Sequence, residues 1–170
     1  MRSASNADAR AIAQIHVDAW RAAYSGLIPD RFLKRLSVEG RERQWADTLS
    51  AGEGAPLVLV AESRGRLVGF STVAVPARDP GEDDDVGEIP AIYVAPGEWG
   101  HGVGRALIEA SANAMREAGC REAILWAVAG NDRAAGFYVA QGWRDDDGRR
   151  PSQYFPDASE VVEVRFRRAL

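Results

Sequence analysis

The residues of this sequence most suited to chemistry are three glycines spaced two apart, Gly100, Gly102 and Gly104. They lie between a predicted strand over 88–94 and a predicted helix that runs to about residue 118. Because glycine has no Cβ atom, the backbone of such a turn can approach an anion closely. The free N–H groups of the first helical turn converge where the helix dipole is positive. A pyrophosphate is a suitable ligand for this arrangement.

Three kinds of phosphate-binding turn have glycines at similar spacing, and two of them do not fit. A Walker loop requires lysine after its last glycine, whereas Arg105 follows Gly104. A dinucleotide-binding turn requires glycine three residues beyond Gly102, where Arg105 stands, and it normally follows the first strand of a chain. A coenzyme A site remains, and the alternative is a glycine-rich turn that binds no ligand. In a coenzyme A site, Arg105 adds a positive charge beside amides that run to Ala106.

The elements that position this turn are predicted from hydrophobic periodicity. Apolar residues at helical spacing, such as Ile12 and Ile15, predict a first helix that Asn6 or Asp8 caps. Predicted helices cover residues 8–24, 30–36, 39–49, 103–118 and 131–141. Predicted strands cover residues 57–61, 67–75, 88–94, 123–128, 143 onward and 162–166. Helices, then a hairpin, then alternating strands and helices predict one mixed α/β domain over residues 1–170.

Composition argues against several classes of protein. A net charge of −4 argues against a nucleic-acid partner, because such proteins usually carry a basic face. Cys120 is the single cysteine, so neither an internal disulfide nor a cysteine-rich zinc site can form, and no metal is expected. No apolar run approaches the roughly 18 residues of a membrane span, and the N-terminus has no apolar core of the signal-peptide type. We therefore expect no membrane association and a cytoplasmic location.

Residues 88–107 are similar to the coenzyme A-binding core of the GNAT superfamily of N-acetyltransferases, whose motif is Gln/Arg-x-x-Gly-x-Gly/Ala. Gly102 and Gly104 occupy the two small positions of this motif. Trp99 stands where glutamine or arginine is usual, which removes one side-chain contact but leaves the backbone amides in place.

Two further segments carry the same resemblance. Residues 20–29 are similar to the first-helix region of the family, and residues 131–143 to its later Asn…Phe-Tyr…Gly-Phe segment. The resemblance therefore covers nearly the whole chain. It implies a mixed α/β fold whose central sheet is mostly antiparallel, with a splayed parallel pair of strands, flanked by helices. It also implies an enzyme that takes an acetyl group from acetyl-CoA.

The resemblance implies where this donor binds. The pantetheine arm is expected in the gap between strands 88–94 and 123–128, paired with backbone groups of the first strand. The phosphates are expected at the amides of residues 100–106. Asn131 is expected to hydrogen-bond the arm while it also caps the helix that follows. The implied donor-binding residues are Ile92, Tyr93, Val94, Gly100, His101, Gly102, Val103, Gly104, Arg105, Ala106, Asn131, Ala134 and Tyr138.

The resemblance also implies direct attack of a neutral primary amine on the thioester within a ternary complex. Tyr138 matches the family tyrosine that protonates the departing thiolate, and a phenol with a pKa of about 10 suits this role. The alternative for Tyr138 is a core tyrosine on a helix face. Glu88 opens the strand that carries the thioester, so it is the candidate base through a water, or else a solvated strand end.

The acceptor is expected to enter between the first helices and the last hairpin. The candidate acceptor-contacting residues are Trp20, Tyr24, Glu88 and Tyr154. Aromatic residues at helical spacing also suit a hydrophobic core. His16 is expected to pack or face solvent, and His101 to face solvent. The acidic runs 82–85 and 145–147 either attract a cationic amine or form solvated loops.

Two alternatives to acetyl transfer stay open at this point. One is a non-catalytic module that senses acyl-CoA, and the other is the same fold with a longer acyl donor. An intact Tyr138 favours the enzyme over the sensor. The sequence does not identify the acceptor beyond a small-molecule or peptide amine, and it allows a monomer or a homodimer.

Overall fold

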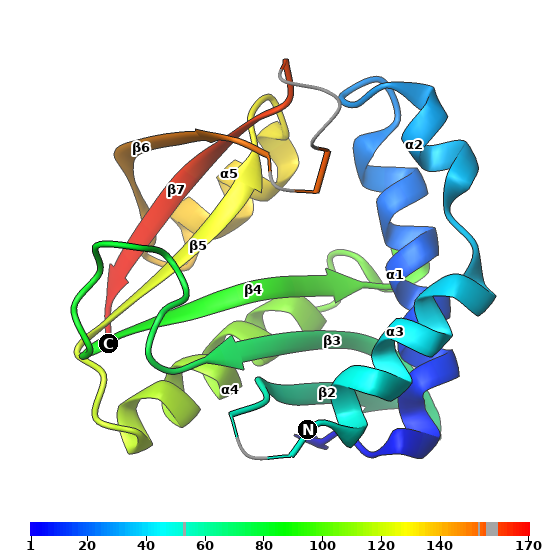
Figure 1. The fold of residues 1–170 in the computed structure, drawn as a ribbon, viewed down its shortest axis with the longest axis horizontal. Coiled ribbons are helices and arrows are strands. Elements are labelled where there is room, and N and C mark those ends of the chain that lie inside the picture. The colour runs from blue at the N-terminus through cyan, green and yellow to red at the C-terminus, as the bar shows by residue number, and fades with distance from the viewer. Residues whose placement is uncertain (53, 153, 156–159) are drawn as a thin grey trace.

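A seven-stranded sheet forms the centre of the molecule, with the spatial order β1-β2-β3-β4-β5-β7-β6 (Figure 1). The computed structural model describes residues 1–52, 54–152, 154–155 and 160–170. The strands are β1 (Arg2–Ser3), β2 (Leu57–Ser63), β3 (Arg66–Ala74), β4 (Val86–Val94), β5 (Glu122–Val128), β6 (Arg144–Pro151) and β7 (Val162–Ala169). β4 and β5 pair in parallel, and the other described pairs are antiparallel. The mixed, mostly antiparallel sheet that the family resemblance implied is confirmed.

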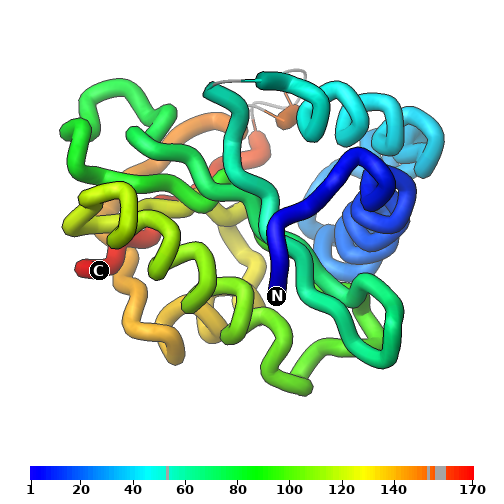
Figure 2. Tube along the Cα trace, turned by 90° about the horizontal axis from the view of Figure 1, so that it is seen from below, coloured from blue at the N-terminus to red at the C-terminus, as the bar shows by residue number. Residues whose placement is uncertain are grey.

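Helices cover both faces of this sheet. The α-helices among the described residues are α1 (Ala9–Tyr24), α2 (Asp30–Arg35), α3 (Val38–Ser50), α4 (Val103–Glu117) and α5 (Asp132–Ala140). The short 3-10 helices η1 (Asn6–Asp8) and η2 (Pro96–Glu98) precede α1 and follow β4. α1 and α3 pack on the opposite face of the sheet from α4 (Figure 2). Within the described ranges, none of the helices has the length and apolar character that crossing a membrane requires.

Asp8 is the N-cap residue of α1, one of the two predicted, but its side chain makes no capping hydrogen bond to that helix. Ser5 is the N-cap of the preceding turn η1, and its backbone N–H and hydroxyl both donate to the Asp8 carboxylate. Arg2 in β1 donates to the two oxygens of Asp8 at 2.7 and 2.9 Å. These bonds lower the pKa of Asp8. The Arg2–Asp8 pair ties the N-terminal strand to the first helix.

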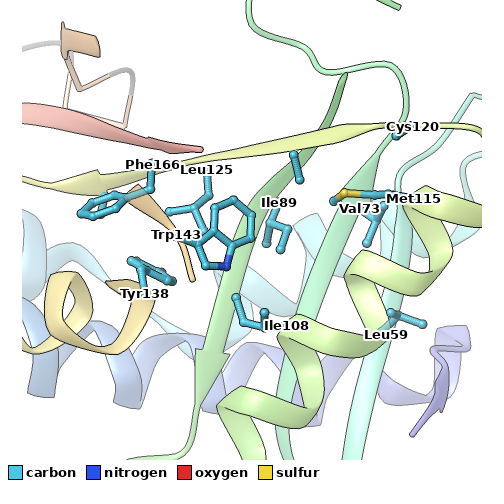
Figure 3. Close-up of a cluster of buried hydrophobic side chains, with 12 residues drawn as sticks. Leu59, Val73, Ile89, Ile108, Met115, Cys120, Leu125, Tyr138, Trp143 and Phe166 are labelled. Carbon is cyan, nitrogen blue, oxygen red and sulfur yellow. The ribbon is translucent and has the colours of Figure 1, made fainter. Parts of the chain in front are cut away.

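A buried cluster under α4 and α5 holds the starts of β4 and β5 together (Figure 3). Ile108 and Met115 of α4 pack in one cluster with Ile89 of β4 and Leu125 of β5, and all four are buried. Burying one such side chain contributes roughly 1.5–3 kcal/mol. The cluster therefore fixes one end of the β4–β5 pair.

β4 bends where it leaves β5. It has two residues, Ile89 and Pro90, opposite the single residue Val73 of β3, which is a β-bulge. Pro90 also has no N–H to donate to a neighbouring strand. The last position at which β4 pairs with β5 is Glu88, opposite Ile124. The two strands diverge beyond it, as the family resemblance implied (Figure 1).

The acidic runs hold ion pairs. The run 145–147 lies inside β6, so the expectation of a loop there is wrong. Asp146 accepts hydrogen bonds from Arg165 and Arg167 of β7. Glu82, from the earlier acidic run, accepts from the same two arginines at 2.6 Å. Because these carboxylates are already paired, they are not free to attract a cationic amine.

Gly87→Ala is expected to destabilise the fold by about 1–3 kcal/mol, the usual cost of overpacking a core. A Cβ atom at Gly87 would lie 2.7 Å from Sδ and 2.8 Å from Cγ of the buried Met115. Urea unfolding followed by circular dichroism measures the change. Gly97→Ala is the control, because a Cβ atom there meets no atom within 4 Å. Equal unfolding free energies for the two variants would contradict the close packing at Gly87.

Candidate active site

A cavity of about 470 Å³ lies beside the diverging end of β4. Its walls come from α1, the end of β4, the turn before α4, and α5. The predicted site residues that line it are Tyr24, Ile92, Tyr93, Val94, Gly100, Gly102, Gly104, Arg105, Asn131, Ala134 and Tyr138. The structure therefore brings together most of the residues expected to bind the donor. We call this space the donor cavity.

The glycine-rich turn presents unpaired backbone donors to the donor cavity. Gly100 and Gly102 have φ angles of +82° and +83°, a conformation that side chains with a Cβ atom rarely adopt. Gly102 is the N-cap of α4, and no side chain caps this helix. Within the described ranges, no acceptor is bonded to the N–H groups of residues 102–105. These groups are free to bind an anion at the positive end of α4.

Two of the backbone amides expected to bind the phosphates are already hydrogen-bonded within the chain. Ala106 N–H donates to the Gly102 carbonyl at 3.0 Å, the first backbone bond of α4. His101 N–H donates to the Glu98 carbonyl at 3.4 Å. The set of free amides is therefore shorter than the expected 100–106. The side chains of His101, Val103 and Ala106 are not part of the cavity wall, and His101 is exposed as expected.

Asn131 combines two roles at the start of α5. Its side-chain oxygen accepts from Ala134 N–H at 3.1 Å, so it is the N-cap of this helix. It also lines the donor cavity. Because the oxygen is used by the cap, the amide NH₂ group is the part of Asn131 available to a ligand.

Tyr138 lies between the hydrophobic core and the donor cavity. Its ring contacts Phe166 and Phe137 at centroid distances of 5.4 Å, and it lies beside Trp143 (Figure 3). Burial raises the pKa of the Tyr138 phenol well above its ordinary value. The hydroxyl therefore stays protonated across the physiological range, as a proton donor to a leaving thiolate must be.

Several wall residues were not predicted from the sequence. Trp99 donates its indole N–H to the Val94 carbonyl at 2.8 Å, and the Arg133 guanidinium lies 4.3 Å from the Trp99 ring centroid. Arg133 and Arg105 thus place two cations on the wall that holds the free amides. Arg133 lies in the predicted helix 131–141, and its positive charge is the one feature of the sequence that could have identified it as a ligand-binding residue. The other additional wall residues are Ala19, Ala23, Glu98, Phe137 and Gln141.

Glu88 does not occupy the position expected of a base. Its side chain is 3% exposed, and both carboxylate oxygens accept hydrogen bonds from Arg78. Backbone N–H and Nε of Arg78 bond to Oε2, and Nη2 bonds to Oε1, at 2.9–3.1 Å. Glu88 is not among the residues that line the donor cavity. The structure therefore does not support proton transfer from the acceptor to Glu88, and the alternative of a solvated strand end is also wrong.

Aromatic side chains close the α1 side of the donor cavity. The hydroxyls of Tyr24 and Tyr93 are 3.4 Å apart, and both residues line the cavity. Burial raises the pKa of Tyr93 to about 12 and that of Tyr24 well above 10. His16 stacks on Tyr93 at 4.9 Å and accepts from the Trp45 indole N–H, so its expected packing role is confirmed. Burial lowers the pKa of His16 to about 3, so it is neutral.

Trp20 and Tyr154 line a different cavity. Their rings meet edge to face at 6.1 Å, and they form part of a second space of about 250 Å³ between α1, α2, the start of α3 and residues 154–155. The structure thus separates these two predicted acceptor contacts from Tyr24, which lines the donor cavity. We call this space the second cavity.

The comparisons with known proteins assign the family. Residues 10–143 match the family described as "Acetyltransferase (GNAT) family". The chain therefore belongs to the GNAT acetyltransferase family. It is an acyltransferase enzyme, as the sequence resemblance implied.

Two relatives have related sequences over most of the chain. The "Uncharacterized N-acetyltransferase YuaI" of Bacillus subtilis is 28% identical over 167 residues, which cover 98% of this chain and 88% of that protein. The "Aminoglycoside N(6')-acetyltransferase type 1" of Stenotrophomonas maltophilia is 35% identical over 124 residues, which cover 72% of this chain and 71% of that protein.

Solved structures share the fold along almost the whole chain. The ribosomal-protein-alanine N-acetyltransferase of Brucella melitensis has a TM-score of 0.74 at 25% identity, over 99% of this chain and 98% of that one. The PaiA N-acetyltransferase of Thermoplasma acidophilum, solved in complex with coenzyme A, has a TM-score of 0.75 at 17% identity, over 99% and 97%. At 17% identity, the likeness to the Thermoplasma protein shows only that the two chains share a fold.

Glu88→Gln is expected to lower the free energy of unfolding by about 1–3 kcal/mol, the cost of removing a charged hydrogen-bond partner from a buried site. Because Glu88 is bonded to Arg78, the pH–rate profile is expected to keep its shape in this variant. Denaturant unfolding and steady-state kinetics across pH 6–9 measure the two effects.

The matched control for this variant is Glu42→Gln, which removes the partner of Arg10 in a more exposed pair. It is expected to change stability by about 0–1 kcal/mol. A pH–rate profile that loses an ionisation only in Glu88→Gln would return Glu88 to the role of base.

Proposed function

We propose that this protein transfers the acetyl group of acetyl-CoA to a primary amine by direct attack in a ternary complex. The observation that carries this proposal is a row of free N–H groups over residues 102–105 on the wall of a cavity that Tyr138 also lines. A diphosphate at the row and a thioester near the tyrosine fit the two ends of one extended donor.

The proposed donor position uses the chain's own unpaired groups. The amides of residues 102–105 hold the diphosphate, and Arg105 and Arg133 add charge beside it. Beyond Glu88, β4 has no pairing with β5, so its residues Ile92–Val94 face the cavity and are available to the pantetheine amides. The Asn131 NH₂ group donates to the same arm.

In the proposed chemistry, solvent takes up the proton of the amine and Tyr138 supplies a proton to the leaving sulfur. Acetyl-CoA supplies the activated acyl group as a thioester. The acceptor nitrogen forms a bond to the acyl carbon, the carbon–sulfur bond breaks, and Tyr138 donates its proton to the sulfur and then regains one from solvent. The amine gives up its own proton to solvent, because Glu88, the expected base, is bonded to Arg78 and does not line the donor cavity. The acceptor therefore reacts as the neutral amine.

The acceptor named for the Stenotrophomonas relative is an aminoglycoside, which is a polycation. In this chain, Glu82 and Asp146 are bound by Arg165 and Arg167, and the described wall of the second cavity carries arginine but no carboxylate. These observations support an acceptor other than a polycation.

Gly104→Val is expected to weaken coenzyme A binding at least about tenfold, or about 1.4 kcal/mol. A Cβ atom at Gly104 would lie 3.1 Å from the Phe137 ring, so a branched side chain pushes α5 away from the turn. Titration calorimetry with coenzyme A measures the affinity. The control Gly136→Ala, whose Cβ meets no atom within 4 Å, is expected to bind normally. Equal affinity for coenzyme A in both variants would contradict the proposed diphosphate site at the start of α4.

Tyr138→Phe is expected to lower kcat at least about tenfold, while the Kd for acetyl-CoA and the unfolding midpoint stay unchanged, because only the proton donor is removed. The assay measures free thiol released from acetyl-CoA, and from a longer acyl-CoA, with a panel of primary amines. A rate within about twofold of wild type, about 0.4 kcal/mol, would remove Tyr138 from the proposed chemistry. Absence of thiol release with every amine would contradict the proposed function.

A further inference from the structure

The second cavity has aromatic walls and a positive charge. Trp20, Phe32, Tyr154 and Phe155 contribute rings to it, and its charged groups among the described residues are Arg35 and Arg41. Ser37 and Gly40, at the start of α3, also line it, so the positive end of this helix dipole faces the same space. The electrostatic character of the cavity therefore favours an anion.

Arg41 differs from the other half-buried arginines of the described chain. Arg150, Arg165, Arg167 and Arg168 share its intermediate exposure, and each has a carboxylate within 2.6–2.9 Å. Arg41 has no carboxylate partner among the residues that the structure describes. A half-buried charge without a counter-ion is unfavourable, which makes this position suited to an anionic ligand.

The Arg41 side chain is held in place without that counter-ion. Its guanidinium lies 5.0 Å from the centroid of the Trp20 ring, and Nη1 donates to Gln44 Oε1 at 2.9 Å. Burial lowers the pKa of Arg41, which still remains protonated in the physiological range. The remaining N–H groups of the fork are available to two oxygens of one ligand group.

The second cavity adjoins the donor cavity through shared aromatic residues. Trp20 lines the second cavity, whereas its α1 neighbours Ala19 and Ala23 line the donor cavity. The Trp20 ring lies 6.3 Å from Tyr93, whose hydroxyl meets that of Tyr24. The Trp20 ring and then Tyr93 therefore stand between Arg41 and the donor cavity.

We propose that the second cavity binds the anionic group, a carboxylate or a phosphate, of a small amine acceptor, and that Arg41 pairs with that group. This inference rests on the proposed acetyl transfer and names the acceptor class for it. Arg35 adds charge at the rim, and the aromatic walls contact the body of the acceptor. The amine end extends past Trp20 toward Tyr93 and the thioester. Arginine suits this role because its planar fork matches the two oxygens of such groups.

The first test measures anion binding without acetyl transfer. Succinate and inorganic phosphate are titrated against the wild-type protein while its tryptophan fluorescence is followed, because Trp20 lies beside Arg41. Arg41→Gln is expected to weaken binding at least about tenfold, and Arg41→Lys, which keeps the charge but loses the fork, less than that. Arg43→Gln, on the same helix but exposed and outside the cavity wall, is the control and is expected to bind normally. Equal anion affinity in wild type and Arg41→Gln would overturn the proposal.

The second test measures acceptor preference. Thiol release from acetyl-CoA is compared for 6-aminohexanoate against hexylamine, and for O-phosphoethanolamine against ethanolamine. The wild type is expected to prefer the anionic member of at least one pair about tenfold in kcat/KM, and the preferred pair tells carboxylate from phosphate. Arg41→Gln is expected to lose this preference, whereas the control Arg43→Gln is expected to keep it.

The outcomes separate the two proposals. Equal rates for both members of each pair in the wild type would overturn the anionic acceptor and leave acetyl transfer intact. Anion binding that depends on Arg41, without thiol release for any amine, would overturn the proposed function while it supports an anion site.

Discussion

The early end of the β4–β5 pairing is the constraint on which the rest of the site depends. The bulge at Ile89 and Pro90 bends β4, and Pro90 removes a backbone donor, so the parallel pair stops at Glu88. If β4 and β5 stayed paired along their whole length, β5 would occupy the space beside Ile92–Val94. Separating two strands leaves backbone groups without partners, which is unfavourable unless water or a ligand bonds to them. The buried cluster of Ile108, Met115 and Leu125 offsets this cost by fixing the closed end.

Charge in this molecule is organised by pairing across the sheet. Arg165 and Arg167 of β7 reach Glu82 and Asp146, and Arg78 reaches Glu88, so the acidic residues near the splayed strands are largely neutralised by the chain itself. Among the described residues, each cavity has positive groups without a carboxylate partner: the free amides before α4 at one and the Arg41 guanidinium at the other. The overall negative charge therefore says little about the ligands, because the local field at each cavity is positive.

The sequence predicted the elements well and the long-range pairs poorly, and both results have a physical cause. Helices and strands follow local periodicity, so α1, α4 and β5 lie where the pattern placed them. The glycine turn was found because positive φ angles and free amides leave a local signal. Tyr138 was identified from the family resemblance. Strand β1 is two residues long, too short for any period. The Arg78–Glu88 and Arg167–Glu82 pairs join residues 10 and 85 positions apart, and no local pattern shows which charges will meet.

The buried phenols at the donor cavity limit the proton transfers that the site can perform. Burial raises the pKa of Tyr24, Tyr93 and Tyr138, so all three are neutral proton donors and none can accept the proton of an ammonium group. In the proposed chemistry, the acceptor therefore reaches the thioester already deprotonated. An anionic group on the acceptor, left unpaired, would raise the pKa of its own amine and lower the reactive fraction. Pairing that group with Arg41 cancels this effect, and the positive charge of Arg41 itself disfavours the ammonium form. Under the proposed assignment, the same guanidinium that binds the acceptor also increases the amount of amine able to react.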